Sequence, residues 1–203
     1  MSFAIYCVGR NYADHIKELG NTPFDQPAIF MKPGSSLVTD GRIVIPPFTH
    51  SLHYETELII RLKEDAYQTS ETEALSCFDE IAIGLDLTAR DLQADLKERS
   101  FPWLLSKGFK GAATCSDFIK RANLPEDISF SMTVNGEVRQ SGHLHDMIYP
   151  IPNLISLISQ YCALRAGDLI YTGTPSGVGP LAIGDEISLF IEGREMDHYK
   201  VAA

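Results

Sequence analysis

The sequence predicts a β-rich α+β domain built on a rolled or sandwiched mixed sheet. Short runs of β-branched and aromatic residues recur along the 203 residues, and turn-forming Gly, Pro and Asn residues separate them. Only three or four stretches have a helical pattern, and all of them are short. A chain of this length can bury one sizeable core, so we expect residues 1–203 to form a single domain.

The N-terminal part is expected to alternate short strands with turns, the strands covering residues 3–8, 28–31, 43–45 and 53–60. A short helix over 12–19 follows Asn11, which is a good N-cap, and ends at Gly20. His15 and Glu18 are spaced i, i+3 on that helix and share a face. The pair could be a general base with an orienting carboxylate, but a surface ion pair is the commoner interpretation.

The strand predicted over 53–60 carries two carboxylates, Glu55 and Glu57, at alternate positions on one face. Their Cα atoms would lie roughly 6.6 Å apart. A bare Glu-x-Glu is most often a solvent-facing polar stripe, but the apolar run at 58–60 indicates a strand buried on both faces. Buried carboxylates need a partner, either a divalent cation or a basic side chain.

The middle of the chain adds a third carboxylate and further basic groups. Ser70-x-x-Glu73 predicts a capping box that opens a helix reaching about residue 78. The apolar strand predicted over 81–87 contains Asp86, whose burial would require a cation or several hydrogen-bond donors. A helix over 89–99, capped by Thr88, would align three polar side chains on one face: Arg90, Gln93 and Lys97.

Two lysines lie in loops and are ambiguous. Lys32 would sit at the end of a strand, where sites often form, or be a solvated lysine. Lys107 lies in a Gly-containing loop and is a second candidate basic group for the carboxylates.

The C-terminal half continues with strands and one longer helix. Alternation over 128–134 predicts a half-buried strand, and Asn135-Gly136 is a strong hairpin signal before the returning strand 137–140. We expect a helix over 153–161 whose core face includes Tyr161, and strands at 168–171, 186–191 and 198–202. The Gly/Thr loop 172–179 could bind a carboxylate, but it lacks the Gly-Lys-Ser/Thr ending of a phosphate-binding loop.

The net charge and the cysteine spacing disfavour several kinds of binding partner and structural site. The net charge of −10 disfavours nucleic acid and anionic membranes, and an anionic substrate would need a local cation or basic cluster. The four cysteines have no Cys-x-x-Cys spacing, so neither a zinc site nor a disulfide framework is expected. No signal peptide or membrane span is visible, so we expect a cytoplasmic protein.

Several motifs, in this order along nearly the whole chain, together resemble the fumarylacetoacetate hydrolase family, particularly its small acylpyruvate hydrolase and oxaloacetate decarboxylase-like members. The motifs are Gly9-Arg10-Asn11-Tyr12-Ala13-Asp14-His15, Met31-Lys32-Pro33, His53-x-Glu55-x-Glu57, Leu85-Asp86-Leu87-Thr88-Ala89-Arg90-Asp91-x-Gln93, Ser106-Lys107 and Thr172-Gly173-Thr174-Pro175-x-Gly177-Val178-Gly179. The resemblance implies a mixed β-sandwich roll of the family's C-terminal-domain type and a homodimer.

The resemblance also implies a set of site residues. Mg²⁺ or Mn²⁺ would be held by Glu55, Glu57 and Asp86, the same carboxylates that stand out on physical grounds. It implies a catalytic His15–Glu18 pair on a lid above the metal. Four further side chains would face the substrate: Arg90, Gln93, Lys107 and Thr174. The resemblance also assigns Lys107 a catalytic role.

The activity implied is metal-dependent hydrolysis of the C–C bond of small 2,4-dioxo acids, acylpyruvates such as acetylpyruvate or fumarylpyruvate, through a metal-stabilised pyruvate enolate. The substrate would thus be a small diketo acid or dicarboxylate. Two alternatives stay open. One is oxaloacetate decarboxylation or keto–enol tautomerisation, which uses the same enolate, and the other is a non-catalytic, metal-stabilised binding protein.

Overall fold

Three sheets form the framework of the molecule. The computed structural model describes residues 3–13 and 26–202. The largest sheet has the strand order β2-β1-β11-β5-β6-β8. It is a mixed sheet, because β1 and β11 are parallel and every other pair of neighbouring strands in it is antiparallel. Its strands are β1 (Ala4–Gly9), β2 (Ala28–Pro33), β5 (Thr56–Leu62), β6 (Phe78–Leu85), β8 (Ile119–Lys120) and β11 (Leu169–Tyr171).

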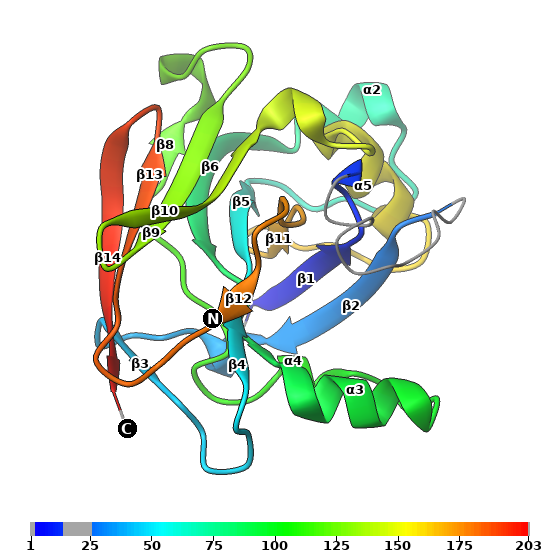
Figure 1. Ribbon diagram of the computed structural model, residues 1–203. Helices are drawn as coiled ribbons and strands as arrows, with labels where there is room; N and C mark the ends of the chain where they lie inside the picture. Colours follow the sequence, from blue (N-terminus) through cyan, green and yellow to red (C-terminus); the bar gives the residue numbers. More distant parts are fainter. Residues whose placement is uncertain (1–2, 14–25, 203) are drawn as a thin grey trace.

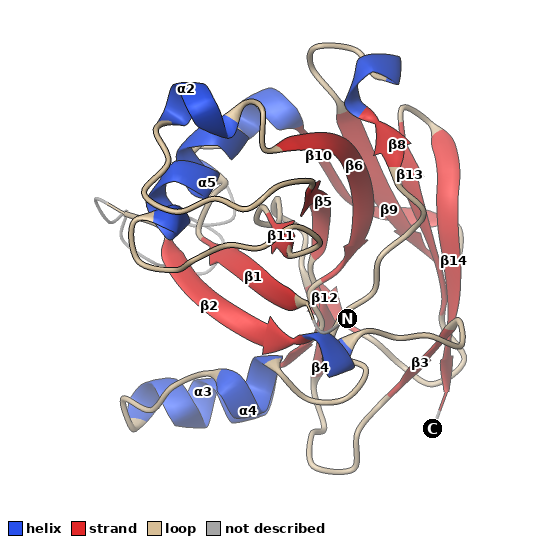
Figure 2. Cartoon of the chain, turned by 180° about the vertical axis from the view of Figure 1, so that it is seen from behind, coloured by secondary structure: helices blue, strands red, loops and turns tan. Residues whose placement is uncertain are grey.

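A five-stranded sheet stands beside the first, at one side of the molecule in Figures 1 and 2. Its order is β10-β9-β13-β14-β3. Its strands are β3 (Arg42–Val44), β9 (Ser129–Val134), β10 (Glu137–His143), β13 (Glu186–Ile191) and β14 (Arg194–Ala202). A small third sheet, β12-β4-β7, is made of β4 (Leu52–Tyr54), β7 (Thr88–Ala89) and β12 (Gly179–Pro180).

The helices are short and lie at the ends of the sheets. Helices α2 (Glu71–Ala74) and α5 (Ile151–Ser159) lie together near one end, while α3 (Arg90–Glu98) and α4 (Leu104–Lys107) lie near the other (Figure 1). Three 3-10 turns complete the described elements: η1 (Gly34–Ser36), η2 (Arg121–Asn123) and η3 (Leu144–Asp146). Within residues 3–13 and 26–202, no helix has both the length and the apolar character needed to cross a membrane.

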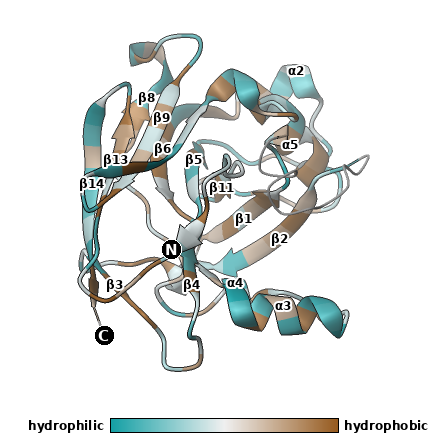
Figure 3. Ribbon diagram, viewed as in Figure 1, coloured by the Kyte–Doolittle hydropathy of each residue, from teal (hydrophilic) through white to brown (hydrophobic). Residues whose placement is uncertain are grey.

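The main core fills the space between the two large sheets and under α5. Inward side chains of β5 and β6, such as Ile60 and Ile83, and of β9 and β13, such as Met132 and Leu189, are completely buried within it. Figure 3 shows hydrophobic residues along β1 and β2, whereas most residues of α2 and α3 are hydrophilic. The strand-rich, mixed-sheet class predicted from the sequence is confirmed.

One predicted strand is wrong in a way that matters for the site. Residues 53–60 do not form a continuous strand, because β4 ends at Tyr54 and β5 begins at Thr56. Tyr54 pairs with β12 in the small sheet, whereas β5 pairs with β6 and β11 in the large one. Glu55 therefore lies where the chain leaves the small sheet and enters the large one. At this point the Thr56 N–H donates to the Gln140 side-chain oxygen at 2.9 Å.

Two helices also differ from the prediction. Thr88 is not the cap of α3, because it belongs to β7, where its hydroxyl donates to the carbonyl of Asp86 at 3.2 Å. Tyr161 lies beyond the end of α5 and is 77% exposed, so it does not belong to the core face formed by residues such as Leu154 and Ile158.

Two local signals are confirmed. The Ser70–Glu73 capping box opens α2 as predicted, although the helix ends at Ala74 because β6 begins at Phe78. The Asn135-Gly136 turn joins β9 to β10 with positive φ at both residues, 53° and 81°.

Candidate active site

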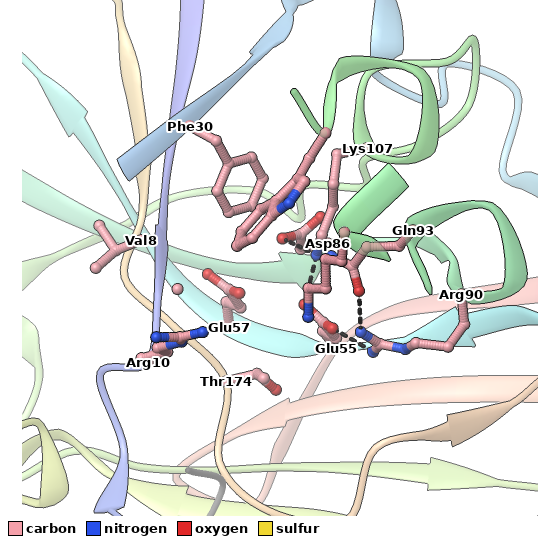
Figure 4. Close-up of a pocket in the computed structure, with 13 residues that line it drawn as sticks. Val8, Arg10, Phe30, Glu55, Glu57, Asp86, Arg90, Gln93, Lys107 and Thr174 are labelled. Atoms are coloured by element: carbon pink, nitrogen blue, oxygen red, sulfur yellow. Dashed lines mark hydrogen bonds and ion pairs between the residues drawn. The ribbon is translucent and has the colours of Figure 1, made fainter. Parts of the chain in front are cut away.

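Three buried carboxylates converge where β5 and β6 leave the large sheet. Glu55, Glu57 and Asp86 each offer an oxygen, and these oxygens lie within 4.8 Å of one another (Figure 4). Their exposed fractions are 6%, 2% and 1%. Antiparallel pairing sets Glu57 opposite Gly84, and the Asp86 N–H donates to the Glu55 carbonyl at 2.8 Å. The β5–β6 ladder thus brings together acids that are about thirty residues apart in the sequence.

Lys107 lies between two of these carboxylates. Its Nζ donates to Glu55 Oε2 at 2.7 Å and to Asp86 Oδ2 at 2.8 Å. Burial lowers the pKa of Lys107, but the charges of Asp86 and Glu55 outweigh burial and raise it above the ordinary value. Lys107 is therefore a cation in this site. Arg90 adds a second positive charge as an ion pair with Glu55.

Lys32 is a third cation behind the cluster, not a solvated lysine. It is completely buried, and its Nζ donates to the carbonyls of Leu87 at 3.1 Å and Ala112 at 2.8 Å, and to the carbonyl of Lys107. It lies 2.7 Å from Asp86 Oδ1, a charge contact without hydrogen-bond geometry. The sequence left Lys32 ambiguous because nothing in it shows that its strand end folds against the carboxylates.

Glu57 is the carboxylate with the least compensation. The Gly173 N–H donates to its Oε2 at 2.7 Å, and no ion pair joins it to a basic residue in the part of the chain that the structure describes. Burial, followed by the charges of Asp86 and Glu55, raises the pKa of Glu57 well above 4.5. The cluster therefore lacks positive charge on the Glu57 side.

These features fit a hard divalent cation. The donors are oxygens only, Asp86 Oδ1 receives no directed hydrogen bond, and Glu57 lacks a cationic partner among the described residues. An ion held there would compete with Lys107 for the oxygens of Glu55 and Asp86. Mg²⁺ and Mn²⁺ both take such ligands.

The other predicted substrate-side residues lie around the same pocket, which encloses about 460 Å³ with its open mouth included. Arg90 Nη1 donates to Gln93 Oε1 at 2.7 Å, so α3 presents the two side chains as a unit. The Thr174 hydroxyl accepts from the side-chain amide of Gln140 at 2.8 Å. Phe30 and Trp103 form an apolar wall, edge to face at 5.8 Å. The structure thus brings Arg90, Gln93, Lys107 and Thr174 to the carboxylate cluster.

The predicted catalytic pair, His15 and Glu18, lies outside the described residues, so its role stays a prediction.

Sequence reasoning missed Gln140 and gave Arg10 no role. Gln140 is 1% exposed, and its side chain joins the five-stranded sheet to the site by bonding Thr56, Thr174 and Pro175. No sequence signal could have found it, because a register shift in β10 decides which residue points inward. Arg10 lines the pocket, and only its place in the Gly9-Arg10-Asn11 motif marked it.

Comparisons with known proteins identify the family of this chain. Residues 4–197 match the family described as "Fumarylacetoacetate (FAA) hydrolase C-terminal". Among curated proteins, the chain is 39% identical over 200 residues to "Oxaloacetate tautomerase FAHD1, mitochondrial" of Mus musculus, covering 97% of this chain and 90% of the mouse protein. It is 44% identical over 192 residues to the protein of that name in Arabidopsis thaliana, covering 93% and 86%.

Solved structures of fumarylacetoacetate hydrolase-like proteins also superpose closely on this chain. A fumarylpyruvate hydrolase of Pseudomonas aeruginosa in complex with Mn²⁺ and pyruvate superposes with a TM-score of 0.92 at 32% identity, covering 98% of this chain and 89% of that one. A putative fumarylacetoacetate hydrolase family protein of Yersinia pestis gives 0.93 at 39% identity, covering 98% and 92%.

Proposed function

Because this chain belongs to the fumarylacetoacetate hydrolase family, we propose that it is a divalent-metal-dependent enzyme that interconverts the keto and enol forms of oxaloacetate. The observation that carries the proposal is the buried cluster of Glu55, Glu57 and Asp86 with Lys107 and Arg90 beside it in one pocket. Relatives named as oxaloacetate tautomerases, 38% to 44% identical over nearly the whole chain, favour this reaction over C–C hydrolysis.

Keto–enol tautomerisation requires two things of the protein: stabilisation of the negative charge that develops on the substrate, and proton transfer. A bound Mg²⁺ or Mn²⁺ would act as a Lewis acid toward the 2-oxo group, which favours loss of a proton from C3. Lys107 and Arg90 would bind the 1-carboxylate and the 2-oxo group, where they offset the negative charge of substrate and carboxylates. In the metal-free site the charges of Asp86 and Glu55 raise the pKa of Lys107, so we assign Lys107 an electrostatic role.

The remaining residues would orient the substrate and exclude water. Gln93 and Thr174 offer hydrogen bonds on the pocket lining, and Phe30 and Trp103 close one side with apolar surface. His15, with Glu18 favouring its protonated form, is the proposed group that takes a proton from C3 and delivers it to the 2-oxo oxygen, which gives the enol; the reverse transfer restores the keto form.

Hydrolysis of a 2,4-dioxo acid is the second candidate, and the observation that favours it is the likeness to the fumarylpyruvate hydrolase. Hydrolysis needs an activated water in addition to the steps above, whereas tautomerisation does not. Oxaloacetate decarboxylation would break the bond to C4 with the same placement of charge.

Turnover by metal-stripped protein with Mg²⁺ or Mn²⁺ added back tests the proposal. The substrates are oxaloacetate, fumarylpyruvate and acetylpyruvate, followed by enol absorbance and by pyruvate release. We expect rapid, metal-dependent enol–keto interconversion of oxaloacetate without pyruvate formation, and loss of this activity in Glu57→Gln. Lys110→Met, an exposed lysine outside the pocket lining, is the matched control.

Three results would contradict the tautomerase assignment. Pyruvate released from a diketo acid would make the protein a hydrolase, and pyruvate with CO₂ from oxaloacetate would make it a decarboxylase. Metal-dependent thermal stabilisation without any turnover would make it a binding protein.

A further inference from the structure

We propose that His53 is a positioning residue for Arg90: its ring nitrogen Nδ1 accepts a hydrogen bond from Arg90 Nε and so fixes the guanidinium group at the pocket. The inference rests on the proposed function, because Arg90 is taken to bind the 1-carboxylate and the 2-oxo group of the substrate. His53 is not among the residues that line the pocket, so it acts through Arg90 and not on the substrate itself.

The small sheet sets His53 and Arg90 on the same face. Strands β4 and β7 are antiparallel, and His53 lies opposite Thr88. Arg90, two residues further on, continues this ladder, because its N–H donates to the Ser51 carbonyl at 2.8 Å. His53 and Arg90 are therefore diagonal neighbours. Diagonal neighbours in a sheet are about 7–8 Å apart, a separation that aromatic and long side chains can span.

Arg90 has one buried donor without an acceptor. Its Nη2 forms the ion pair with Glu55, and its Nη1 donates to Gln93 Oε1 at 2.7 Å (Figure 4). Its Nε is inaccessible to water and has no hydrogen-bond partner in the part of the chain that the structure describes. In the planar guanidinium group, Nε–H and one N–H of Nη2 point from the same edge. The acceptor for Nε therefore has to lie beside Glu55.

His53 Nδ1 is the complementary atom. It is also inaccessible to water, and no hydrogen bond joins it to any of residues 3–13 and 26–202. His53 lies two residues before Glu55, on the strand that leads to it. Unpaired buried donors and acceptors are costly, and one hydrogen bond from Nε to Nδ1 satisfies both atoms. Burial and then the charge of Arg90 lower the pKa of His53, which agrees with a neutral ring whose Nδ1 can accept.

A neutral acceptor suits this position, because Arg90 has to keep its charge for the substrate. A divalent ion held by Glu55 would draw on the carboxylate that pairs with Arg90 in this structure. The imidazole ring holds the guanidinium group in place without cancelling its positive charge, whereas another carboxylate would cancel it. The charge of Arg90 is then directed at the anionic substrate.

Nitrogen NMR of the ¹⁵N-labelled, Mg²⁺-loaded protein at neutral pH tests the contact directly. We expect His53 to carry its proton on Nε2, and we expect a ¹⁵N–¹⁵N coupling between Arg90 Nε and His53 Nδ1 across the hydrogen bond. A ring protonated at Nδ1, or the absence of this coupling, would overturn the proposal. The measurement uses the unaltered protein, so it does not depend on the folding of any variant.

Binding of oxalate to the Mg²⁺-loaded protein, measured by calorimetry, tests the consequence for the ligand. Oxalate imitates the 1-carboxylate and the 2-oxo group and has no proton to transfer. His53→Leu should weaken its binding about tenfold, as for loss of an oriented charge-assisted contact. His53→Asn should keep most of the affinity, because its side-chain oxygen lies near the place of Nδ1. If His53 only filled space, Leu would be the better replacement. His50→Leu, an exposed histidine three residues earlier, is the control.

The outcomes separate this inference from the proposed function. Unchanged oxalate affinity in His53→Leu, or weaker binding by His53→Asn than by His53→Leu, would overturn the positioning role even in a protein that interconverts the forms of oxaloacetate. Failure of the unaltered protein to bind oxalate would overturn it too. The coupling together with His53-dependent oxalate binding, in a protein that turns over no oxo acid, would support the positioning role and reject the tautomerase assignment.

Discussion

Lys107 is the side chain on which the charge balance of the site depends most. Its ammonium group joins Glu55 to Asp86, and all three groups are nearly inaccessible to water. Removing one partner of a buried ion pair leaves an uncompensated charge, typically at about 3–5 kcal/mol. Lys107→Met should therefore lower the free energy of unfolding of the metal-free protein by an amount of this order, measured by urea denaturation.

The same variant should gain more from Mg²⁺ than the unaltered protein does, since an ion could replace the missing positive charge. Lys120→Met is the control, because the Lys120 side chain is 55% exposed and pairs with Asp79 and Glu80 at the surface, so its loss should change little. Equal Mg²⁺ stabilisation in both variants would show that Lys107 and the ion do not share oxygens.

Among single residues of the site, the three carboxylates were predicted from the sequence, whereas Lys32 and Gln140 were not. Asp86 stood out because a carboxylate inside an apolar run is unusual, and Glu55 and Glu57 stood out because they come directly before the apolar run 58–60. Lys32 and Gln140 did not, because a polar residue beside a turn or on an alternating strand has an ordinary surface interpretation. Their burial is decided by strands that are distant in sequence, such as β10 against β5.

Among the elements, strand β6 has a position, Gly84, at which the packing leaves no room for a side chain. A Cβ on Gly84 would lie 1.8 Å from the Thr114 carbonyl oxygen and 2.7 Å from Ile59 Cδ1. The Thr114 backbone cannot retreat, because its N–H donates to the Leu85 carbonyl and its own carbonyl accepts from the Tyr171 hydroxyl at 2.6 Å.

Gly84→Ala should therefore destabilise the protein by about 3 kcal/mol or more, or prevent soluble expression, because the overlap involves backbone atoms. Gly9→Ala is the matched control in the same sheet, since its nearest contact would be Ala28 Cβ at an ordinary 3.5 Å. Urea denaturation compares the two, and similar midpoints would contradict the close approach of β6 to residue 114.

A second element-scale prediction concerns the link between β10 and the site. Gln140 accepts from the Thr56 N–H and donates to Thr174 and Pro175, all within 3.0 Å. Gln140→Met keeps the volume but leaves buried polar groups unpaired, each at about 1–3 kcal/mol. We expect lower stability and a higher KM, because Thr174 loses its orienting donor.

Arg139→Met, one position earlier, tests whether position in β10 alone matters. Its side chain forms an exposed ion pair with Glu137, so stability and KM should both stay close to those of the unaltered protein. A rise in KM in both variants would point to a general disturbance of β10.

Elements were predictable where the local signal and the tertiary structure agree. Asn135-Gly136 and the Ser70–Glu73 box rely on contacts within a few residues, so they were confirmed. The break at Glu55 was not predictable, because alternation continues through it and only the change of partner strands interrupts the ladder. Likewise, Thr88 has the side chain of a helix cap, but pairing with β4 takes it into the small sheet.

For the whole molecule, the acidic site predicts how stability should change with pH. The pKa of Glu57 is raised in the folded protein, so the folded state binds this proton more tightly than the unfolded chain does. Its contribution is therefore fully present below the unfolded value of 4.5 and is lost as pH rises through the folded value. A net charge of −10 at pH 7 adds general repulsion in the same direction.

Mg²⁺ should reverse this loss, because an ion and a proton compete for the same oxygens. We expect the rise in melting temperature on adding Mg²⁺ to be small near pH 5 and to grow toward neutral pH. Glu57→Gln should remove most of this pH dependence, since its amide neither titrates nor carries charge. Melting curves of metal-stripped protein across this range, with and without Mg²⁺, measure the effect, and an Mg²⁺ shift independent of pH would separate Glu57 from the ion.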